Sequence, residues 1–130
     1  MQRVILDTNF LLLPLQFKID IFAEIERLIG KFEPIVLSTT LNELKKLVGS
    51  RSVKISRLAL SAMEIVKKCR IIEVDVKPEE NYDDVILRIA KENNYVVATN
   101  DRLLRRKLRK AGITTIFLRQ RAYLDIEGHT

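Results

Sequence analysis

The chain has 130 residues, of which 47% are hydrophobic and 31% charged, and its formal net charge is +6. This length fits a single domain, residues 1–130, and the balance excludes a disordered chain. The longest uncharged stretch, residues 8–17, is shorter than the about 20 apolar residues that span a bilayer. One cysteine, Cys69, excludes an internal disulfide, so we expect a cytoplasmic protein with no membrane partner.

Short β-rich runs alternate with longer helical patterns along the chain. The predicted strands are residues 2–6, 34–37, 70–74, 95–98 and 114–118, and the predicted helices are residues 19–29, 41–48, 52–69, 83–93 and 102–111. Such alternation indicates an α/β fold, a parallel sheet with helices on both faces. Residues from about 120 to 130 follow the last predicted strand as a possible loose tail.

Acidic residues recur where the predicted strands end. Asp7 directly follows the first strand, in RVILDTNFLLLP, and Glu43 lies in the first turn of the helix after the second strand. Asp83 and Asp84 open the helix after the third strand, and Asp101 follows the fourth. In an open parallel sheet these positions all lie at the carboxyl edge, where ligands bind. We therefore expect at least four carboxylates to converge there.

Each acid taken singly also has a structural explanation. Thr40 and Glu43 have the spacing of a capping box, and so do Asn81 and Asp84. Acids at helix N-termini gain about 0.3–1 kcal/mol from the helix dipole. Asp7 fits this explanation worst, because a buried apolar strand ends on it and apolar residues resume three positions later.

Crowded carboxylates raise one another's pKa, so a cation is expected among them. A soft metal site is excluded, because Cys69 is the only cysteine and the only histidine, His129, is next to the last residue. The donor set suits a hard divalent cation, Mg²⁺ or Mn²⁺.

Positive charge concentrates in one segment. Residues 101–121 carry eight Lys and Arg residues and one acid, a net +7, while the rest of the chain sums to −1. Leu104, Leu108 and Ala111 form the buried stripe of the helix 102–111, so its basic residues point outward. This face is either simply solvated or binds a polyanion such as RNA. The candidate phosphate-binding residues are Arg102, Arg105, Arg106, Arg109, Lys110, Arg119 and Arg121.

Four stretches resemble the PIN-domain nucleases: VILDTN, LNELKKL, NYDDVILRIA and VVATNDRLLRRKL. DTNF and the IFLRQR ending look closest to the branch that includes the rRNA-processing nuclease of the small ribosomal subunit, and similarity to VapC-type toxins is looser. The resemblance implies a three-layer α/β/α PIN-like domain. Its central sheet would have five parallel strands in the order 3-2-1-4-5.

The resemblance also implies a Mg²⁺- or Mn²⁺-dependent endoribonuclease that cuts single-stranded RNA, in particular rRNA or pre-rRNA. The acids carried over as catalytic and metal-binding are Asp7, Glu43, Asp83 and Asp101. Asp83 fits the spacing of the third acid, and Asp84 is its alternative. The candidates for residues that orient these acids without being metal ligands themselves are Asn9, Thr99, Asn100 and Asp84.

Two other functions stay open at this point. The chain could be a VapC-type toxin ribonuclease, or a non-catalytic PIN module that binds RNA or a protein partner. Expected partners, besides RNA, are a second copy of the chain or ribosome-assembly proteins.

Overall fold

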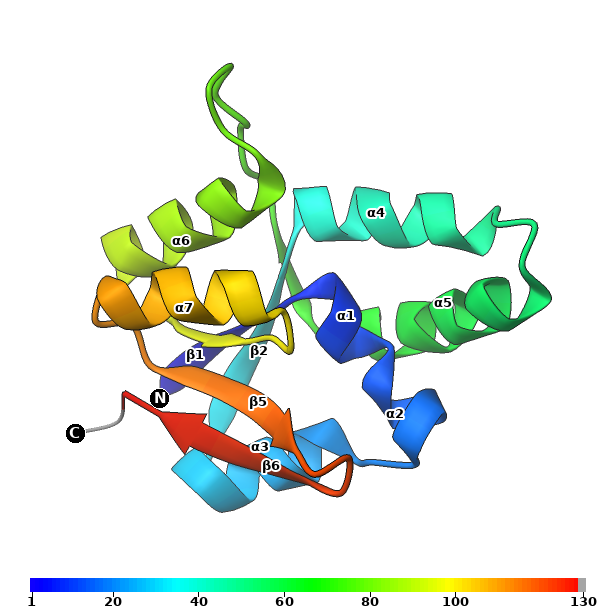
Figure 1. Cartoon of the computed structure of the whole chain (residues 1–130), viewed down its shortest axis with the longest axis horizontal. Helices are drawn as coiled ribbons and strands as arrows, with labels where there is room; N and C mark the ends of the chain where they lie inside the picture. The colour runs from blue at the N-terminus through cyan, green and yellow to red at the C-terminus, as the bar shows by residue number, and fades with distance from the viewer. Residues whose placement is uncertain (129–130) are drawn as a thin grey trace.

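The computed structural model describes residues 1–128 as a six-stranded sheet flanked by helices (Figure 1). The strands are β1 Gln2–Leu6, β2 Phe32–Leu37, β3 Arg70–Ile72, β4 Val96–Ala98, β5 Thr115–Arg119 and β6 Tyr123–Glu127. The helices are α1 Thr8–Leu11, α2 Leu13–Phe17, α3 Ile21–Ile29, α4 Ser38–Val48, α5 Val53–Val66, α6 Tyr82–Asn93 and α7 Arg102–Lys110. None of these helices is both long enough and apolar enough to cross a bilayer.

The strand order is β3-β2-β1-β4-β5-β6, and every pairing among the first five strands is parallel. This confirms the predicted order and the central place of β1. Because the five strands run the same way, their carboxyl ends lie along one edge of the sheet.

The sixth strand was not predicted, and the expectation of a loose tail is wrong for Tyr123–Glu127. This segment pairs antiparallel with β5 through a tight turn in which the Ala122 amide donates to the Arg119 carbonyl at 3.1 Å. The alternation within β6 explains the pairing, because Leu124 is buried among residues of β5 and α3. The end of the predicted tail, His129 and Thr130, lies outside the described residues.

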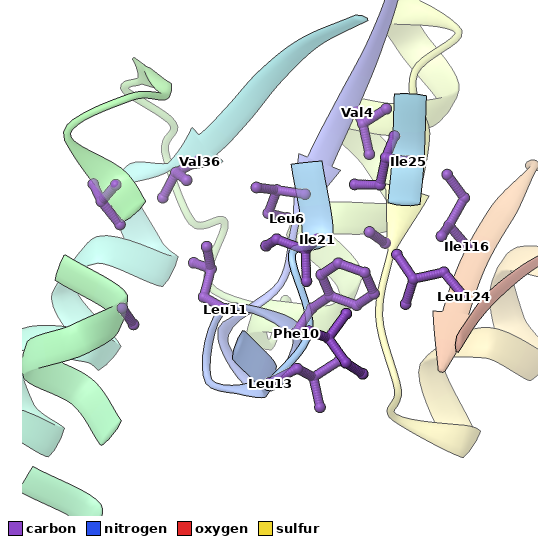
Figure 2. Packing of buried hydrophobic residues seen from close by; sticks show 14 of the residues in the cluster. Val4, Leu6, Phe10, Leu11, Leu13, Ile21, Ile25, Val36, Ile116 and Leu124 are labelled. Atoms are coloured by element: carbon purple, nitrogen blue, oxygen red, sulfur yellow. The ribbon is translucent and has the colours of Figure 1, made fainter. Parts of the chain in front are cut away.

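A hydrophobic core covers each face of the sheet. In β1, Val4 and Leu6 face one core and Ile5 faces the other, as the two-residue period of a strand requires. The first core includes residues of α1, α2, α3 and α5, and Figure 2 shows Phe10 in its midst with Leu13 beside it. Cys69 packs against this core, where burial raises the pKa of its thiol to about 12, as expected for a structural cysteine.

The second core is closed by α6 and α7, which lie together over one side of the sheet in Figure 1. Ile86 of α6 and Leu104 and Leu108 of α7 are almost fully buried against Ile5 of β1. The molecule therefore has the predicted three layers, helices, sheet and helices.

Two short helices, α1 and α2, occupy the stretch directly after β1, where the sequence predicted none. Asp7 begins α1 as its N-cap, and its carboxylate accepts a 2.8 Å hydrogen bond from the Thr8 amide. Pro14 stands in the first turn of α2, where its missing N–H costs no hydrogen bond. These helices turn the chain back over the first core immediately beside the carboxyl edge.

Candidate active site

A pocket of about 240 Å³ opens at the carboxyl edge of the sheet, and four carboxylates from separate segments line it. The lining residues are Asp7, Thr8, Asn9, Leu12, Glu43, Tyr82, Asp83 and Asp101. The structure therefore brings together the four acids singled out in the sequence, at the edge where they were expected. Thr8, Leu12 and Tyr82 were not predicted to line this site, although Thr8 lies within the DTN stretch.

Asp7 is the most deeply placed acid, with only 6% of its surface exposed. Its Oδ1 accepts a hydrogen bond from the Thr8 amide at 2.8 Å. Its Oδ2 accepts from the Thr99 hydroxyl at 2.8 Å and from the Asn9 side-chain amide at 3.0 Å. Asn9 and Thr99 thus hold the Asp7 carboxylate in one orientation.

The segment after β4 joins the same hydrogen-bond network. The amide of Asn100 donates to Asn9 Oδ1 at 2.9 Å, and Asn100 Oδ1 accepts from the Leu118 amide at 2.7 Å. The Asp101 amide donates to the Thr99 hydroxyl at 3.1 Å. Asn100 therefore connects the end of β5 to the site, and it does not line the pocket itself.

Asp101 also has a structural task as the N-cap of α7. Its Oδ1 accepts from the amides of Leu103 and Leu104, at 2.9 and 3.1 Å. Neither bond uses Oδ2. One carboxylate therefore fixes the start of α7 and still presents an oxygen at the pocket.

Glu43 corrects the capping-box interpretation of the sequence. Helix α4 begins at Ser38, three residues earlier than predicted, so Glu43 stands in its second turn and cannot cap it. Instead, Glu43 Oε1 accepts a 3.1 Å hydrogen bond from the Thr8 hydroxyl. Thr8 thereby ties the end of α4 that faces the site to the segment after β1.

The neighbours Asp83 and Asp84 have different places in the structure. Asp84 forms the predicted capping box of α6, because its Oδ2 accepts from the Asn81 amide at 3.0 Å while its own amide donates to Asn81 Oδ1 at 2.9 Å. Asp83 lines the acidic pocket and Asp84 does not.

The loop before α6 is held by Arg88, whose guanidinium binds both carboxylate oxygens of Glu80, at 2.8 and 3.1 Å.

Burial and mutual repulsion make three of these acids reluctant to ionise. The pKa of Asp7 is raised, first by burial and further by Asp83 and Asp101, although its bonds to Thr99 and Thr8 oppose the rise. The pKa of Glu43 is raised by burial and by Asp7. Burial and the charge of Asp101 likewise raise the pKa of Asp83. The pocket is therefore an electrostatically unfavourable place that a cation would relieve.

The donor set of the pocket suits a hard divalent cation, since it offers carboxylate oxygens and no nitrogen or sulfur ligand from His or Cys. No Lys or Arg lines it. Among residues 1–128, no three acidic, His or Cys side chains are already drawn together as a formed metal site. The acids match such an ion by their chemistry and by their place around one pocket.

The predicted basic face is only partly available. Arg119 pairs with Asp125 at 2.7 Å, and both Arg105 and Arg109 pair with Glu127, at 3.3 and 3.0 Å. Their acidic partners come from β6, the strand that the sequence did not reveal. Arg102, Arg106, Lys110 and Arg121 are exposed and have no ion pair with any residue from 1 to 128.

A larger hollow, of about 620 Å³, lies at the opposite edge of the sheet, beside the amino ends of β1, β4 and β5. Arg3, Lys91 and Tyr95 are among the residues that line it, and none of its lining residues in the described chain is acidic. Size alone would favour this hollow. The chemistry favours the smaller acidic pocket, because polar groups from several segments converge there.

Comparison with known proteins decides the family. The model of a family described as "PIN like domain" matches residues 4–121. The chain belongs to this PIN-like family. The match includes all four acids of the pocket, β1 from Val4 onward, and all of β2 to β5.

Relatives of this PIN-like domain carry two kinds of name. Ribonuclease VapC4 of Methanocaldococcus jannaschii is 38% identical over 98% of this chain and 98% of its own length. The rRNA-processing protein FCF1 of Saccharomyces cerevisiae is 28% identical over 94% of this chain, and the match spans 62% of FCF1. Both branches suggested by the sequence are thus represented.

A solved structure, that of the PIN domain endonuclease Utp24, superimposes on the PIN-like domain with a TM-score of 0.76. It is 30% identical in sequence and covers 98% of this chain and 92% of the Utp24 chain. The likeness therefore extends over nearly the whole of both chains.

Proposed function

We propose that this PIN-like domain is a divalent-metal-dependent endoribonuclease that hydrolyses phosphodiester bonds in single-stranded RNA. The observation that carries the proposal is the acidic pocket, where Asp7, Glu43, Asp83 and Asp101 converge from four segments without a lysine or arginine among them. Such a pocket repels an RNA phosphate unless a cation stands between them. The name of the relative Ribonuclease VapC4 and that of the Utp24 endonuclease support this reaction class.

The proposed ligands are Asp7, Asp83 and Asp101, with Glu43 beside them, and the proposed ion is Mg²⁺ or Mn²⁺. When bound, such an ion offsets the charge of the phosphate and makes water a better nucleophile. The protein's own contribution is orientation. Thr99 and Asn9 fix Asp7, the start of α7 fixes Asp101, and the capping box of α6 places Asp83 on the pocket side.

Glu43 has a different proposed task. Its Oε1 is engaged by the Thr8 hydroxyl at 3.1 Å, which sets the plane of the carboxylate. We therefore assign Glu43 to orienting the attacking water.

The proposed substrate is ribosomal or pre-ribosomal RNA. The similarity to FCF1, named as an rRNA-processing protein, supports this choice. Since the chain spans 62% of FCF1, the substrate and partners of the whole FCF1 protein carry over only as part of this proposal. Ribosome-assembly proteins are the proposed partners that would present the cleavage site.

A cleavage assay on single-stranded pre-rRNA fragments tests the proposal, with Mg²⁺ or Mn²⁺ and with EDTA. The wild type should cut in either metal and not in EDTA, and Asp7→Asn and Asp101→Asn should each lose at least 100-fold in rate, on the order expected when a catalytic group is removed. Asp20→Asn is the matched control, because Asp20 caps α3 outside the pocket and asparagine caps equally well. Cutting that survives in Asp7→Asn, or in EDTA, would refute the mechanism.

A second candidate function is that of a VapC-type toxin. The observation that favours it is the 38% identity to Ribonuclease VapC4 over nearly the full length of both chains. Expression in a host cell separates the two functions: growth arrest that disappears in Asp7→Asn supports the toxin. If Asp7→Asn keeps both its affinity for RNA and its cellular role, the non-catalytic module is the correct description.

A further inference from the structure

Four arginines of α7 share one face of the helix and line a hollow of about 200 Å³. Arg102, Arg105, Arg106 and Arg109 have the i, i+3, i+4, i+7 spacing that places side chains on one face. The hollow is separate from the acidic pocket, since no residue lines both. Within the basic segment, this is the place where four arginine side chains surround one hollow.

The charges around this hollow do not balance. Glu127 is the one carboxylate in residues 1–128 that forms an ion pair with any of the four arginines, and it is shared between Arg105 and Arg109. Arg102 and Arg106 are exposed and have no ion pair with any residue from 1 to 128. Four positive charges thus face one negative charge, which leaves the hollow suited to an anion.

The side of the hollow formed by Arg105 is held rigidly. The Arg105 guanidinium lies 3.7 Å from the centre of the Phe117 ring, and its Nε and Nη2 both donate to Glu127 Oε1 at 3.3 Å. Its side chain is 22% exposed. A preorganised guanidinium beside two free ones is the arrangement that binds phosphate oxygens with little loss of side-chain entropy.

The hollow adjoins the acidic pocket along α7. Asp101, which lines that pocket, is the N-cap of α7, and Arg102 is the next residue. With a rise of 1.5 Å per residue, the arginines from Arg102 to Arg109 extend over about 10 Å of the helix axis. An RNA strand that places one phosphate at the acids can therefore continue directly over the arginines.

We infer that this hollow is a subsite for a backbone phosphate of the RNA strand next to the bond that is cut. The inference rests on the proposed function for the position of the cut, although binding itself needs no cleavage. Arg102 and Arg106, which have no ion pair with any residue from 1 to 128, would bind the phosphate oxygens. The Arg105 guanidinium, held by Phe117 and Glu127, would form one side of the subsite. The subsite would set which phosphodiester bond lies over the acids.

Binding of a short single-stranded RNA with a 5′-hydroxyl end, measured by fluorescence anisotropy in EDTA, tests the subsite apart from catalysis. Arg102→Ala and Arg106→Ala should each weaken binding about fivefold at about 0.1 M salt, since one lost phosphate contact lowers the salt slope by about 0.7. Lys68→Ala is the matched control, because Lys68 is exposed on the chain after α5 and lines neither hollow. Its slope should stay within about 0.2 of the wild type, since no phosphate contact is lost.

Equal weakening by Lys68→Ala and Arg106→Ala would overturn the subsite and leave only a net-charge effect. Affinity that depends on a 5′-phosphate end would overturn the assignment to a backbone phosphate. Cleavage products provide a second reading: with Arg106→Ala the cut positions should spread over neighbouring bonds, while Lys68→Ala keeps the wild-type pattern. A wild type that binds RNA through these arginines but never cuts would refute the proposed function and retain the subsite.

Discussion

The hydroxyl of Thr99 donates a 2.8 Å hydrogen bond to Oδ2 of Asp7, although the two residues are 92 positions apart in the sequence. Thr99 directly follows β4 and Asp7 directly follows β1, and these strands are parallel neighbours. Both side chains are buried. The bond stabilises the ionised form of Asp7 against the burial that raises its pKa.

Thr99→Val should therefore damage both stability and cleavage. Valine keeps the shape of threonine but removes the donor, so the free energy of unfolding at neutral pH should fall by about 1–3 kcal/mol and the pKa of Asp7 should rise further. Cleavage should slow, because Asp7 loses one of the groups that orient it. Thr99→Ser keeps the hydroxyl and is the control. Equal melting temperatures and rates for the valine and serine variants would contradict this account.

In the metal-free protein, the acidic pocket should become destabilising as the pH rises from acid to neutral. The folded-state pKa values of Asp7, Glu43 and Asp83 lie above their ordinary values of 3.8, 4.5 and 3.8. Ionising these three carboxyls costs more free energy in the folded state than in the unfolded state. This cost is absent when the pH lies below their ordinary pKa values, and it is complete once the pH has passed their raised folded-state pKa values.

Thermal melts across pH, with and without Mn²⁺, measure this effect. Without metal, the melting temperature of Asp83→Asn should increase relative to that of the wild type as the pH rises through that window, because one repelling carboxylate is gone. Added Mn²⁺ should raise the melting temperature of the wild type at neutral pH by binding the folded state alone. A wild type that gains nothing from Mn²⁺ would mean that the pocket holds no metal ion.

The convergence of the acids could be predicted from the residues themselves, whereas the order of the five parallel strands was implied by the resemblance to PIN-domain nucleases. Each acid directly follows or opens a recognisable element, as Asp7 follows an apolar strand and Asp101 precedes an arginine-rich helix. In a parallel sheet that local position is enough to fix the edge on which a residue lies. For the edge on which the acids lie, no long-range information was needed.

Strand β6 was missed although apolar and charged residues alternate within it, because the run has only five residues and most of its support is tertiary. It pairs with β5 and places Leu124 against α3. The turn between β5 and β6 contains neither glycine nor asparagine, the residues from which a hairpin turn is usually predicted. For the same reason, the ion pairs of the basic face were not predicted, because their acidic residues Asp125 and Glu127 lie on β6. The task of Glu43 was missed because α4 begins earlier than its capping residues suggested.

The turn between β5 and β6 leads to a stability prediction. Gln120 and Arg121 adopt φ values of 55° and 54°, in the left-handed region that costs a residue with a side chain about 1–2 kcal/mol. Arg121→Gly should therefore raise the free energy of unfolding by about 1 kcal/mol, measured by urea denaturation. Arg121→Ala removes the same charge but keeps the strain, so it should bring no gain. Equal stability of the two variants would show that the turn is not strained.

The neighbours Asp83 and Asp84 should respond in opposite ways to the same substitution. Asp84→Ala breaks the capping box of α6, where the Asp84 carboxylate accepts a 3.0 Å bond from the Asn81 amide, and should lower stability by about 0.5–1 kcal/mol. It should leave most of the cleavage activity, because Asp84 does not line the acidic pocket.

Asp83→Ala breaks no side-chain hydrogen bond found within residues 1–128 and removes a carboxylate whose pKa is raised by burial and by the charge of Asp101. The metal-free protein should therefore become more stable at neutral pH, while cleavage and stabilisation by Mn²⁺ both disappear. Both substitutions exchange aspartate for alanine in the first turn of α6, so changes in helix propensity cancel between them. Melts and cleavage rates of the two variants, measured side by side, assign the third acid. If Asp84→Ala is the inactive variant and Asp83→Ala the unstable one, the roles given to these two carboxylates are reversed.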